Sequence, residues 1–509
     1  MSQLDLLLVN APSQRDVYRS LSSLAAVEPP VWAGLIARHC LNKGFSVQIL
    51  DAEAEGMTPA QAATEIEFRS PCLTVFCVYG HQPSASTQCM SGASAVARLL
   101  QGQIPTLALG THPSALPERT LREESFDYVC QGEGPRTIIE WLRRYKVLEE
   151  EGCVSFGSID GIWFRANSDN RPLGNPPAQN IIDLNAELPD QAWELLDMKK
   201  YRAHNWHLWT GDPTGGYASV QTSLGCVFSC HFCCIQAPFG KPGMRWWSPD
   251  NIVEQIERLV LDYGITNIKI PDEMFVLNPQ HVKSICEGLI TWGLGDQLNM
   301  WAYARVDTVK DEEMLALMRR AGFRWLGIGV ESGSQHVRDG VAKGRFGEDD
   351  IFDAIRRVQS HGIHVGANYI FGLPDDTHKS MQTTLTLAEQ LNTEWANFYC
   401  AMAYPGSPLH RIAQKKGWRL PEDPGGHGWI GYAQHAYEAL PLPTETLTYQ
   451  EVLDFRDDAH LRYFSRPEYL SMIDSKFRHT ARRDVEQMLA LGKPKRKHRD
   501  LPDLDIITP

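Results

Sequence analysis

The sequence lacks two features that would assign a protein to a broad class at once. No apolar run approaches the roughly 18–20 residues of a membrane-spanning helix, so no membrane span is expected. A basic excess is also missing. The formal net charge is −13, which disfavours a broad phosphate-binding surface, and we expect no nucleic-acid partner. The opening residues 4–10 contain an acid and run into Ala11-Pro12, which predicts a buried first strand and not a signal sequence.

Clustered cysteines are scarce as well. The 12 cysteines are spread mostly singly over 509 residues, a pattern typical of free thiols in a reducing compartment and not of a disulfide framework. The sequence therefore predicts a cytoplasmic protein. Hydrophobic residues make up 43% of the chain, which is enough for folded cores, and the length predicts two to four domains.

One stretch departs from this pattern. Cys226, Cys230 and Cys233 follow the spacing C-x3-C-x2-C, after residues 217–223 that alternate like a strand. We expect a loop at a strand end that turns three sulfurs toward one centre. Thiolates are the usual ligands of iron–sulfur clusters, which normally take four, so three would leave one iron open to another molecule. The alternatives are a zinc site completed by Cys234 or His231, or simple buried cysteines.

Residues 1–148 alternate short apolar strands with helical segments. This order predicts a doubly wound, Rossmann-like parallel sheet in an α/β fold, with ligands beyond the carboxyl ends of its strands. The expected strands are Asp5–Asn10, Ser46–Asp51, Cys72–Cys77, Pro105–Gly110 and Phe126–Cys130. The expected helices are Val31–Asn42, Pro59–Glu67, Ser84–Leu100, Leu116–Glu123 and Pro135–Arg144.

Residues 149–215 predict an irregular linker, with tryptophans 206 and 209 packed at a domain joint. Residues 216–420 repeat the strand–helix order six times and predict a partial (β/α)6 TIM-type barrel. Its expected strands are Tyr217–Ser223, Asn267–Pro271, Asn299–Ala304, Trp325–Val330, His364–Phe371 and Asn397–Ala403.

Polar side chains follow several of these strands. Asp272-Glu273 follow the second strand, Arg305 follows the third, and Glu331-Ser332 end the fourth. Chemistry in such barrels takes place at the carboxyl ends of the strands. A carboxylate suits an ammonium or metal-bound amine, and a planar guanidinium suits a carboxylate. The alternatives are a helix N-cap for Asp272 and a solvated acid for Glu331.

Residues 421–509 predict a mostly helical C-terminal cap, with helices over 449–464 and 467–491. The run Lys493–Arg499 is strongly basic. The favoured prediction for this run is a solvated disordered tail, and the alternative is a site that attracts a phosphorylated or acidic substrate or partner.

The cysteine motif, with Phe232 as the aromatic of C-x3-C-x-aromatic-C, resembles that of the radical S-adenosylmethionine (SAM) family. The resemblance implies a 4Fe–4S cluster on Cys226, Cys230 and Cys233, with SAM on the open iron, and a 5′-deoxyadenosyl radical formed when an electron breaks the sulfonium bond. It also implies a reductant such as flavodoxin or ferredoxin. The implied cofactor contacts are Phe232, Glu273 (or its neighbour Asp272), Arg305, Glu331 and Ser332.

Three segments of the first 148 residues resemble the cobalamin-binding domain that precedes many radical SAM enzymes: PPVWAGLIARHCLNKGFSVQILDAE, GTHPSALPERTL and GEGPRTIIEWL. Many such domains present D-x-H-x-x-G after the first strand, and that histidine ligates cobalt from below. Here Tyr18 replaces the histidine, so we expect none below the cobalt, and we expect His112 to line the pocket or hold a loop. The implied cobalamin contacts are Gly110, Thr111, His112, Gly132, Glu133 and Gly134.

Together the two resemblances predict methyl transfer to an unactivated carbon of a small molecule. A ring-forming or oxidative cyclase with the same layout stays open. A methylthiotransferase would need a second cluster, but Cys40, Cys72 and Cys77 fall within helix and strand patterns. A non-catalytic cobalamin carrier would not need the intact cysteine motif.

Overall fold

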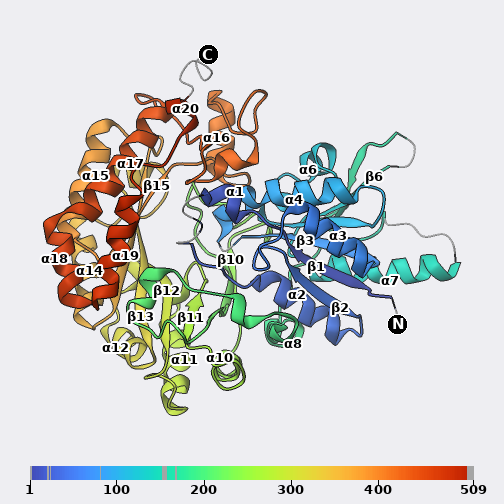
Figure 1. Ribbon diagram of the computed structural model, residues 1–509, viewed down its shortest axis with the longest axis horizontal. Helices are drawn as coiled ribbons and strands as arrows, with labels where there is room; N and C mark the ends of the chain where they lie inside the picture. Colours follow the sequence, from blue (N-terminus) through green and yellow to red (C-terminus); the bar gives the residue numbers. More distant parts are fainter. Residues whose placement is uncertain are drawn as a thin grey trace.

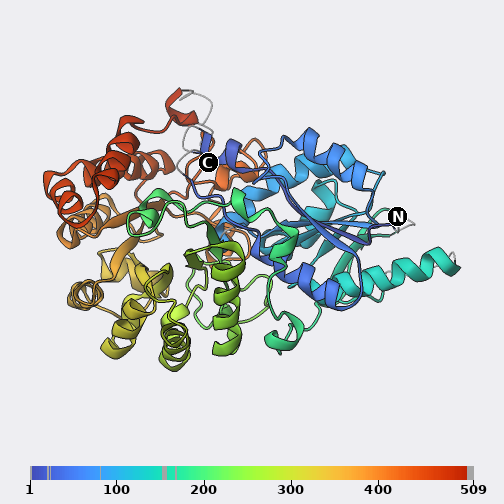
Figure 2. The same cartoon turned by 60° about the horizontal axis from the view of Figure 1, so that its bottom comes forward.

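The computed structural model describes residues 3–19, 22, 25–80, 82–151, 157–166 and 169–500. Figure 1 shows an N-terminal lobe in blue and cyan on the right, with a second lobe on the left in which the C-terminal helices, in orange and red, lie beside a green and yellow barrel. The same side-by-side arrangement is visible in Figure 2. No helix of the described chain has both the length and the apolar character required to cross a bilayer.

The N-terminal sheet confirms the predicted doubly wound arrangement. Its first five strands run parallel in the order β2-β1-β3-β4-β5. They are β1 (Leu6–Asn10), β2 (Val47–Asp51), β3 (Leu73–Val78), β4 (Thr106–Gly110) and β5 (Tyr128–Cys130). The helices that follow them are α1 (Gln14–Tyr18), α2 (Val31–Asn42), α3 (Pro59–Arg69), α4 (Ser86–Leu100), α5 (Thr111–Ala115), α6 (Pro117–Glu123) and α7 (Pro135–Glu151).

Two separate cores lie on the two faces of this sheet, because successive side chains of a strand point to opposite sides. Leu6 and Leu8 of β1 pack in the core that also holds residues of α2 and α7. Leu7 and Val9 pack in the other core, against α3 and α4. Burial on both faces explains why β1 is an uninterrupted apolar run.

The segment expected to be an irregular linker instead begins by extending this sheet. β6 (Ile162–Arg165) pairs antiparallel with β5, and β7 (Pro172–Gly174) pairs antiparallel with β6. Trp163 packs flat on Gly174, where an added Cβ would lie 2.3 Å from the indole ring. Each of these two strands has only three or four residues, and neither belongs to the repeated strand–helix order from which the other short strands were predicted. Two short helices follow, α8 (Leu184–Glu187) and α9 (Asn205–Leu208).

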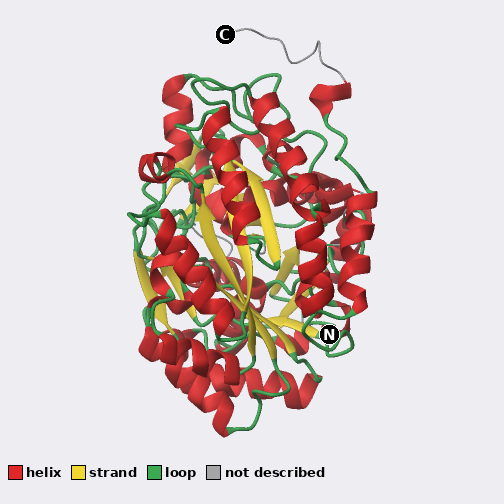
Figure 3. Ribbon diagram, turned by 90° about the vertical axis from the view of Figure 1, so that its left-hand side faces the viewer, coloured by secondary structure: helices red, strands yellow, loops and turns green. Residues whose placement is uncertain are grey.

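The second lobe is the predicted partial barrel, with six parallel strands in the order β8-β11-β12-β13-β14-β15. These strands are β8 (Tyr217–Ser219), β11 (Asn267–Ile270), β12 (Asn299–Arg305), β13 (Phe323–Glu331), β14 (His364–Phe371) and β15 (Trp395–Cys400). Helices cover them on the outside, as Figure 3 shows. They are α10 (Pro249–Tyr263), α11 (Pro279–Thr291), α12 (Glu312–Arg320), α13 (Gln335–Gly340), α14 (Glu348–Ser360) and α15 (His378–Leu391).

The cysteine loop is the connection of a small hairpin that follows the first barrel strand. β9 (Ser223–Cys226) pairs antiparallel with β10 (Gly243–Trp246), so Cys226 ends β9 and the other two motif cysteines lie between β9 and β10. Gly225 has φ +96°, and a Cβ there would lie 2.4 Å from the Gly243 carbonyl oxygen. Glycine is therefore required where the two strands approach beside Cys226.

The C-terminal residues form the predicted helical cap. Its elements are α16 (Pro408–Lys416), the 3₁₀ turn η7 (Trp429–Tyr432), α17 (Tyr449–Ser465), α18 (Pro467–Lys476), α19 (His479–Ala490) and α20 (Lys497–Asp500). The cap also reaches the N-terminal lobe, because the η7 residue Trp429 donates its indole N–H to Glu124 Oε1 at 2.8 Å.

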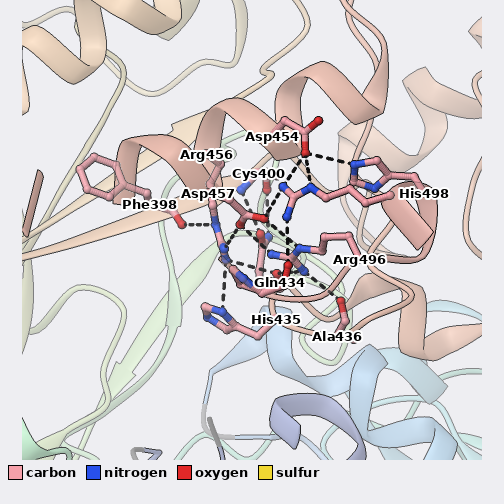
Figure 4. Close-up of polar contacts among 12 residues, drawn as sticks. Phe398, Cys400, Gln434, His435, Ala436, Asp454, Arg456, Asp457, Arg496 and His498 are labelled. Carbon is pink, nitrogen blue, oxygen red and sulfur yellow. Dashed lines mark hydrogen bonds and ion pairs between the residues drawn. The ribbon is translucent and has the colours of Figure 1, made fainter. Parts of the chain in front are cut away.

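The prediction of a solvated tail over Lys493–Arg499 is wrong. Arg496 is fully buried, and its Nε and Nη2 donate to the two carboxylate oxygens of Asp457 at 3.0 and 2.8 Å. Arg499 also donates to Asp457, at 2.9 Å, and to Asp454. Figure 4 shows this network around Asp457, with Arg456 on its other side. The buried Asp457 and the partly exposed Asp454 of α17 bind the basic run, so it is part of the cap.

Candidate functional site

An open cavity lies between the two lobes. On the N-terminal side it is lined by residues that follow the carboxyl ends of β1, β2, β3 and β4: Ser13, Tyr18, Glu53, Tyr79 and Thr111. On the barrel side it is lined by Gln221, Gly225, Ile235, Phe239, Pro271 and Glu273. The carboxyl ends of the strands of both lobes therefore face the same cavity.

Aromatic side chains form part of the wall of this cavity. Trp32 on α2 stacks on Tyr79, with ring centroids 4.4 Å apart and planes 8° apart. Tyr18, which replaces the expected histidine, also lines the cavity, and its ring contacts that of His435 at 5.8 Å. Burial raises the pKa of the Tyr18 phenol, so the group stays neutral. No histidine belongs to the described residues that line the cavity.

The three motif cysteines lie next to this cavity: Cys226 is the last residue of β9, and Cys230 and Cys233 are on the loop that follows it. Burial raises the pKa of the Cys226 thiol to about 11 and that of Cys233 well above its ordinary value, and the neighbouring Cys230 adds to both shifts. Metal binding requires thiolates, so loading this loop is coupled to proton release.

In the described chain, no three His, Cys, Asp or Glu side chains come close enough to share one metal ion. Zinc needs all its sulfurs about 2.3 Å from a single centre, so the arrangement does not favour the zinc alternative. An iron–sulfur cluster contains several irons and does not need its thiolates on one of them. Three free thiols on one loop are the donor set that such a cluster requires.

The neighbouring acids Asp272 and Glu273 have different environments. Asp272 is fully buried and accepts hydrogen bonds from the Thr222 backbone N–H at 2.8 Å and from the Thr222 and Ser223 hydroxyls at 2.6 Å each. It fixes the start of β9. Glu273 lines the cavity, and burial raises the pKa of its carboxyl to about 8. Of the two acids, Glu273 is the one available to a ligand.

Glu331 ends β13 in a conformation that is rare for its residue type. Its φ is +66°, at a register shift between β13 and β14. Its carboxylate accepts a hydrogen bond from Lys343 Nζ at 2.6 Å, and both side chains are buried. Such local strain is common at functional sites. The adjacent Ser332 is fully buried, and its hydroxyl lies 3.2 Å from that of Thr384 on α15.

Arg305 lies against the cysteine loop. Its guanidinium carbon is 3.9 Å from the centroid of the Phe228 ring, and Nη1 lies 3.8 Å from Cys230 Sγ. Nε and Nη2 donate to the two oxygens of Asp307 at 3.0 and 3.1 Å. Phe232, the motif aromatic, packs in two small apolar clusters beside this region.

The segment after β4 does not place His112 in the cavity. His112 is buried, its ring packs edge-on against Trp429 with centroids 4.4 Å apart, and Nδ1 lies 3.3 Å from Thr87 Oγ1. Burial lowers the pKa of its imidazole to about 3. His112 therefore joins the N-terminal lobe to the cap. Thr111 lines the cavity, and Gly110 has no room for a Cβ because the Val78 carbonyl oxygen would lie 2.1 Å away.

The segment Gly132–Gly134 belongs to the joint between the lobes. The buried Glu133 forms an ion pair with Arg245 of β10 and accepts the Ile181 backbone N–H at 2.8 Å. Gly134 has φ +104°, and an added Cβ would lie 2.7 Å from a methyl of Leu109. None of the three glycine-loop residues is among the described residues that line the cavity.

Two residues of the site were not identified from the sequence. Glu28 lines the cavity from the N-terminal lobe, and both its oxygens lie 2.9 Å from Nζ of the buried Lys269 on β11. Lys343 pairs with Glu331. Neither lies in a motif, and each is recognisable only once its partner from a distant segment is in place.

The comparisons with known proteins agree with this geometry. The family model "Radical SAM superfamily" matches residues 220–388, and the model "B12 binding domain" matches residues 21–141. An uncharacterized methyltransferase of Pyrococcus horikoshii is 28% identical over 420 residues, which cover 81% of this chain and 84% of that protein. An anaerobic magnesium-protoporphyrin IX monomethyl ester cyclase of Cereibacter sphaeroides is 23% identical, over 76% of this chain and 61% of the cyclase.

Among solved structures, the radical SAM methyltransferase TsrM of Kitasatospora setae, with cobalamin and a [4Fe-4S] cluster bound, superposes with a TM-score of 0.61 at 20% identity. The match covers 82% of this chain and 75% of TsrM and shows that the fold is shared. With its cysteine motif on the barrel, a B12-binding domain ahead of it and one cavity between them, the chain belongs to the family of cobalamin-dependent radical SAM enzymes.

Proposed function

We propose that this enzyme transfers a methyl group to an unactivated carbon of a small-molecule biosynthetic intermediate. The observation that carries the proposal is the single cavity onto which the ligand edge of the N-terminal sheet and the cysteine end of the barrel both open. Bound together there, the cluster, SAM and cobalamin would supply the radical that activates the substrate and the methyl group that it receives. The chain's own task is to align three partners and exclude water.

Particular side chains have distinct parts in this proposal. Cys226, Cys230 and Cys233 hold the cluster, and Glu273, which faces the cavity, accepts hydrogen bonds from the SAM amine. Glu331 and Ser332 shape the far side of the SAM site at the end of β13, with Lys343 holding the Glu331 carboxylate in place. Thr111 contacts cobalamin beyond β4.

Cluster ligation is tested by anaerobic reconstitution of the full chain. Wild type is expected to bind about four irons per chain, and the triple variant Cys226→Ala/Cys230→Ala/Cys233→Ala is expected to bind none and to leave SAM intact. Cys234→Ala is the matched control, since this thiol neighbours the motif and is buried, and it should keep the cluster. Full iron content in the triple variant would refute the assignment.

Methyl transfer is distinguished from cyclisation by the fate of SAM. Methyl transfer consumes one SAM as methyl donor and one as radical source, so S-adenosylhomocysteine and 5′-deoxyadenosine should form in equal amounts. Methyl-deuterated SAM and a cell extract as substrate source should give a product heavier by the labelled methyl group in mass spectrometry. 5′-Deoxyadenosine without S-adenosylhomocysteine would favour a cyclase, which the similarity to the protoporphyrin ester cyclase supports.

A methylthiotransferase and a non-catalytic cobalamin carrier have less support than methyl transfer. A methylthiotransferase would need a second cluster, but Cys40 and Cys77 lie in the apolar core between α2 and the sheet, and burial raises the pKa of both thiols. Cys72 is buried as well. A carrier would have no use for the three motif cysteines beside the cavity.

We further propose a cytoplasmic location and a reductant such as flavodoxin or ferredoxin. The cysteines of the described chain are free thiols, which are compatible with a reducing compartment. A reductant is required because the cluster must receive an electron before it can cleave SAM.

A further inference from the structure

Arg305 connects the cysteine loop to the carboxyl end of the barrel through contacts that the SAM role predicted for it does not explain. Arg305 is 5% exposed, its guanidinium carbon is 3.9 Å from the centroid of the Phe228 ring, and Nη1 lies 3.8 Å from Cys230 Sγ. Phe228 lies between Cys226 and Cys230 in the motif. The guanidinium therefore contacts two residues of the loop that carries the cluster ligands.

The remaining N–H groups of Arg305 hold the guanidinium in this position. Nε and Nη2 form a bidentate pair with Asp307, and Nη2 also donates to the backbone carbonyl of Lys343. Four contacts from five N–H donors leave one donor for a ligand. A SAM carboxylate could not be bound bidentately unless Arg305 left Asp307.

We propose that Arg305 is a positioning residue that acts on the iron–sulfur cluster through Cys230. Its N–H group and positive charge stabilise the sulfur ligand and make the cluster easier to reduce, and the carboxylate of Asp307 moderates this effect. The inference rests on the proposed ligation of the cluster by Cys226, Cys230 and Cys233. Hydrogen bonds to the ligand sulfurs and nearby charges are the main protein factors that set cluster potentials.

Substitutions of Arg305 and Asp307 should shift the reduction potential of the cluster in opposite directions. Removing a positive charge beside Cys230 disfavours the added electron, and removing the negative charge of Asp307 favours it. A role confined to holding the loop would not produce opposite signs. Because Asp307 offsets part of the arginine charge, we expect a change of about tenfold, and not more, in the ratio of reduced to oxidised cluster at a fixed potential.

The test is a redox titration of the reconstituted full chain, monitored by electron paramagnetic resonance of the reduced cluster. Arg305→Gln should lower the reduced-to-oxidised ratio about tenfold at a given potential, and Asp307→Asn should raise it. Arg305→Lys keeps the charge without the planar contact and should lie between Arg305→Gln and wild type. Lys310→Gln, which removes an exposed positive charge from the same segment, is the control and should match wild type.

A wild-type potential in an Arg305→Gln protein that holds four irons would overturn the proposal, as would shifts of the same sign in Arg305→Gln and Asp307→Asn. If Arg305→Gln fails to load iron, the test depends on Asp307→Asn alone. An unchanged cluster potential in that variant would also contradict the proposal. The assignment of the cluster ligands is tested separately: it would be wrong if the triple cysteine variant retained iron.

Discussion

At the scale of single residues, Asp272 and Glu273 show how adjacent acids acquire different tasks. Asp272 accepts three hydrogen bonds from Thr222 and Ser223, which fixes the strand that leads to the cysteines. Glu273 lies at the cavity, where burial favours its neutral form. The backbone alone places the two side chains on different sides, so only one can reach a ligand.

Glu273 should make the cofactor-free protein less stable as pH rises. Its folded pKa, about 8, lies above the ordinary value of 4.5, so between these values the folded state holds a proton that the unfolded state has lost. The free energy of unfolding therefore falls as pH rises through this window, by on the order of 5 kcal/mol. Glu273→Gln stays neutral at every pH. Its thermal unfolding midpoint should equal that of wild type at pH 5 and be higher than that of wild type at pH 8. Equal unfolding midpoints at both pH values would contradict the assignment.

Asp272→Asn should weaken the β9 hairpin. An amide cannot accept all three hydrogen bonds that the carboxylate accepts, so we expect a loss of about 2–3 kcal/mol and faster hydrogen exchange at residues 222–226. Iron content after reconstitution should fall as well. The control is Asp296→Asn at an exposed position, which should cost less than about 0.5 kcal/mol. If the two variants behave alike, the anchoring role of Asp272 is wrong.

At the scale of elements, the basic run near the C-terminus acts as a strap over the cap. Arg496 and Arg499 both bind Asp457 on α17, and Arg496 Nη1 donates to the Ala436 carbonyl at 2.9 Å. Arg456 extends the network, as Figure 4 shows, since its Nη2 lies 3.3 Å from His435 Nδ1. His435 in turn contacts Tyr18 at the cavity. The strap thus supports a loop that packs on the cofactor region.

Arg496→Met should loosen this part of the cap. Removing one partner of a buried charged network leaves Asp457 less well compensated, and we expect a cost of about 2–4 kcal/mol. Hydrogen exchange followed by mass spectrometry should show faster exchange in α17 and residues 434–437. Lys493→Met removes an ion pair whose side chains are 46% and 59% exposed and should change exchange little. Protection identical to wild type in Arg496→Met would show that the network adds nothing to the cap.

At the scale of the whole molecule, function depends on how the two lobes meet. The ion pairs Glu28–Lys269 and Glu133–Arg245 connect them beside and behind the cavity. Trp429 of the cap covers His112 on the N-terminal lobe. The cavity is thus lined by segments from both lobes, and its shape depends on how the lobes are held together.

The bound cobalamin should lack a histidine on its lower face. Tyr18 replaces the expected ligand, and a neutral phenol is a poor cobalt donor. The test is electron paramagnetic resonance of the cob(II)alamin state in protein uniformly labelled with ¹⁵N and loaded with unlabelled cobalamin. Any axial splitting should be that of ¹⁴N or absent. A ¹⁵N splitting lost in His112→Ala, or in His81→Ala at a position outside the described residues, would show a protein ligand.

The sequence alone determined the repeated strand–helix order of both lobes, the parallel sheet, the partial barrel and the cysteine motif, but not the short strands β6, β7, β9 and β10. Apolar periodicity and motif spacing are local properties, and a single segment displays them in full. It also placed Glu273, Arg305 and Glu331 at strand ends, because the strands beside them belong to a regular strand–helix repeat.

The tertiary structure decided which contacts those residues make. Asp272 accepts hydrogen bonds from Thr222, 50 residues away in the sequence, and Arg305 contacts Cys230, 75 residues away. His112 is held against Trp429, and the basic run is bound by Asp457, although the sequence alone favoured a solvated tail. A charged or polar side chain has many partners of suitable chemistry along a chain. The fold selects one of them by distance and burial, which no local pattern records.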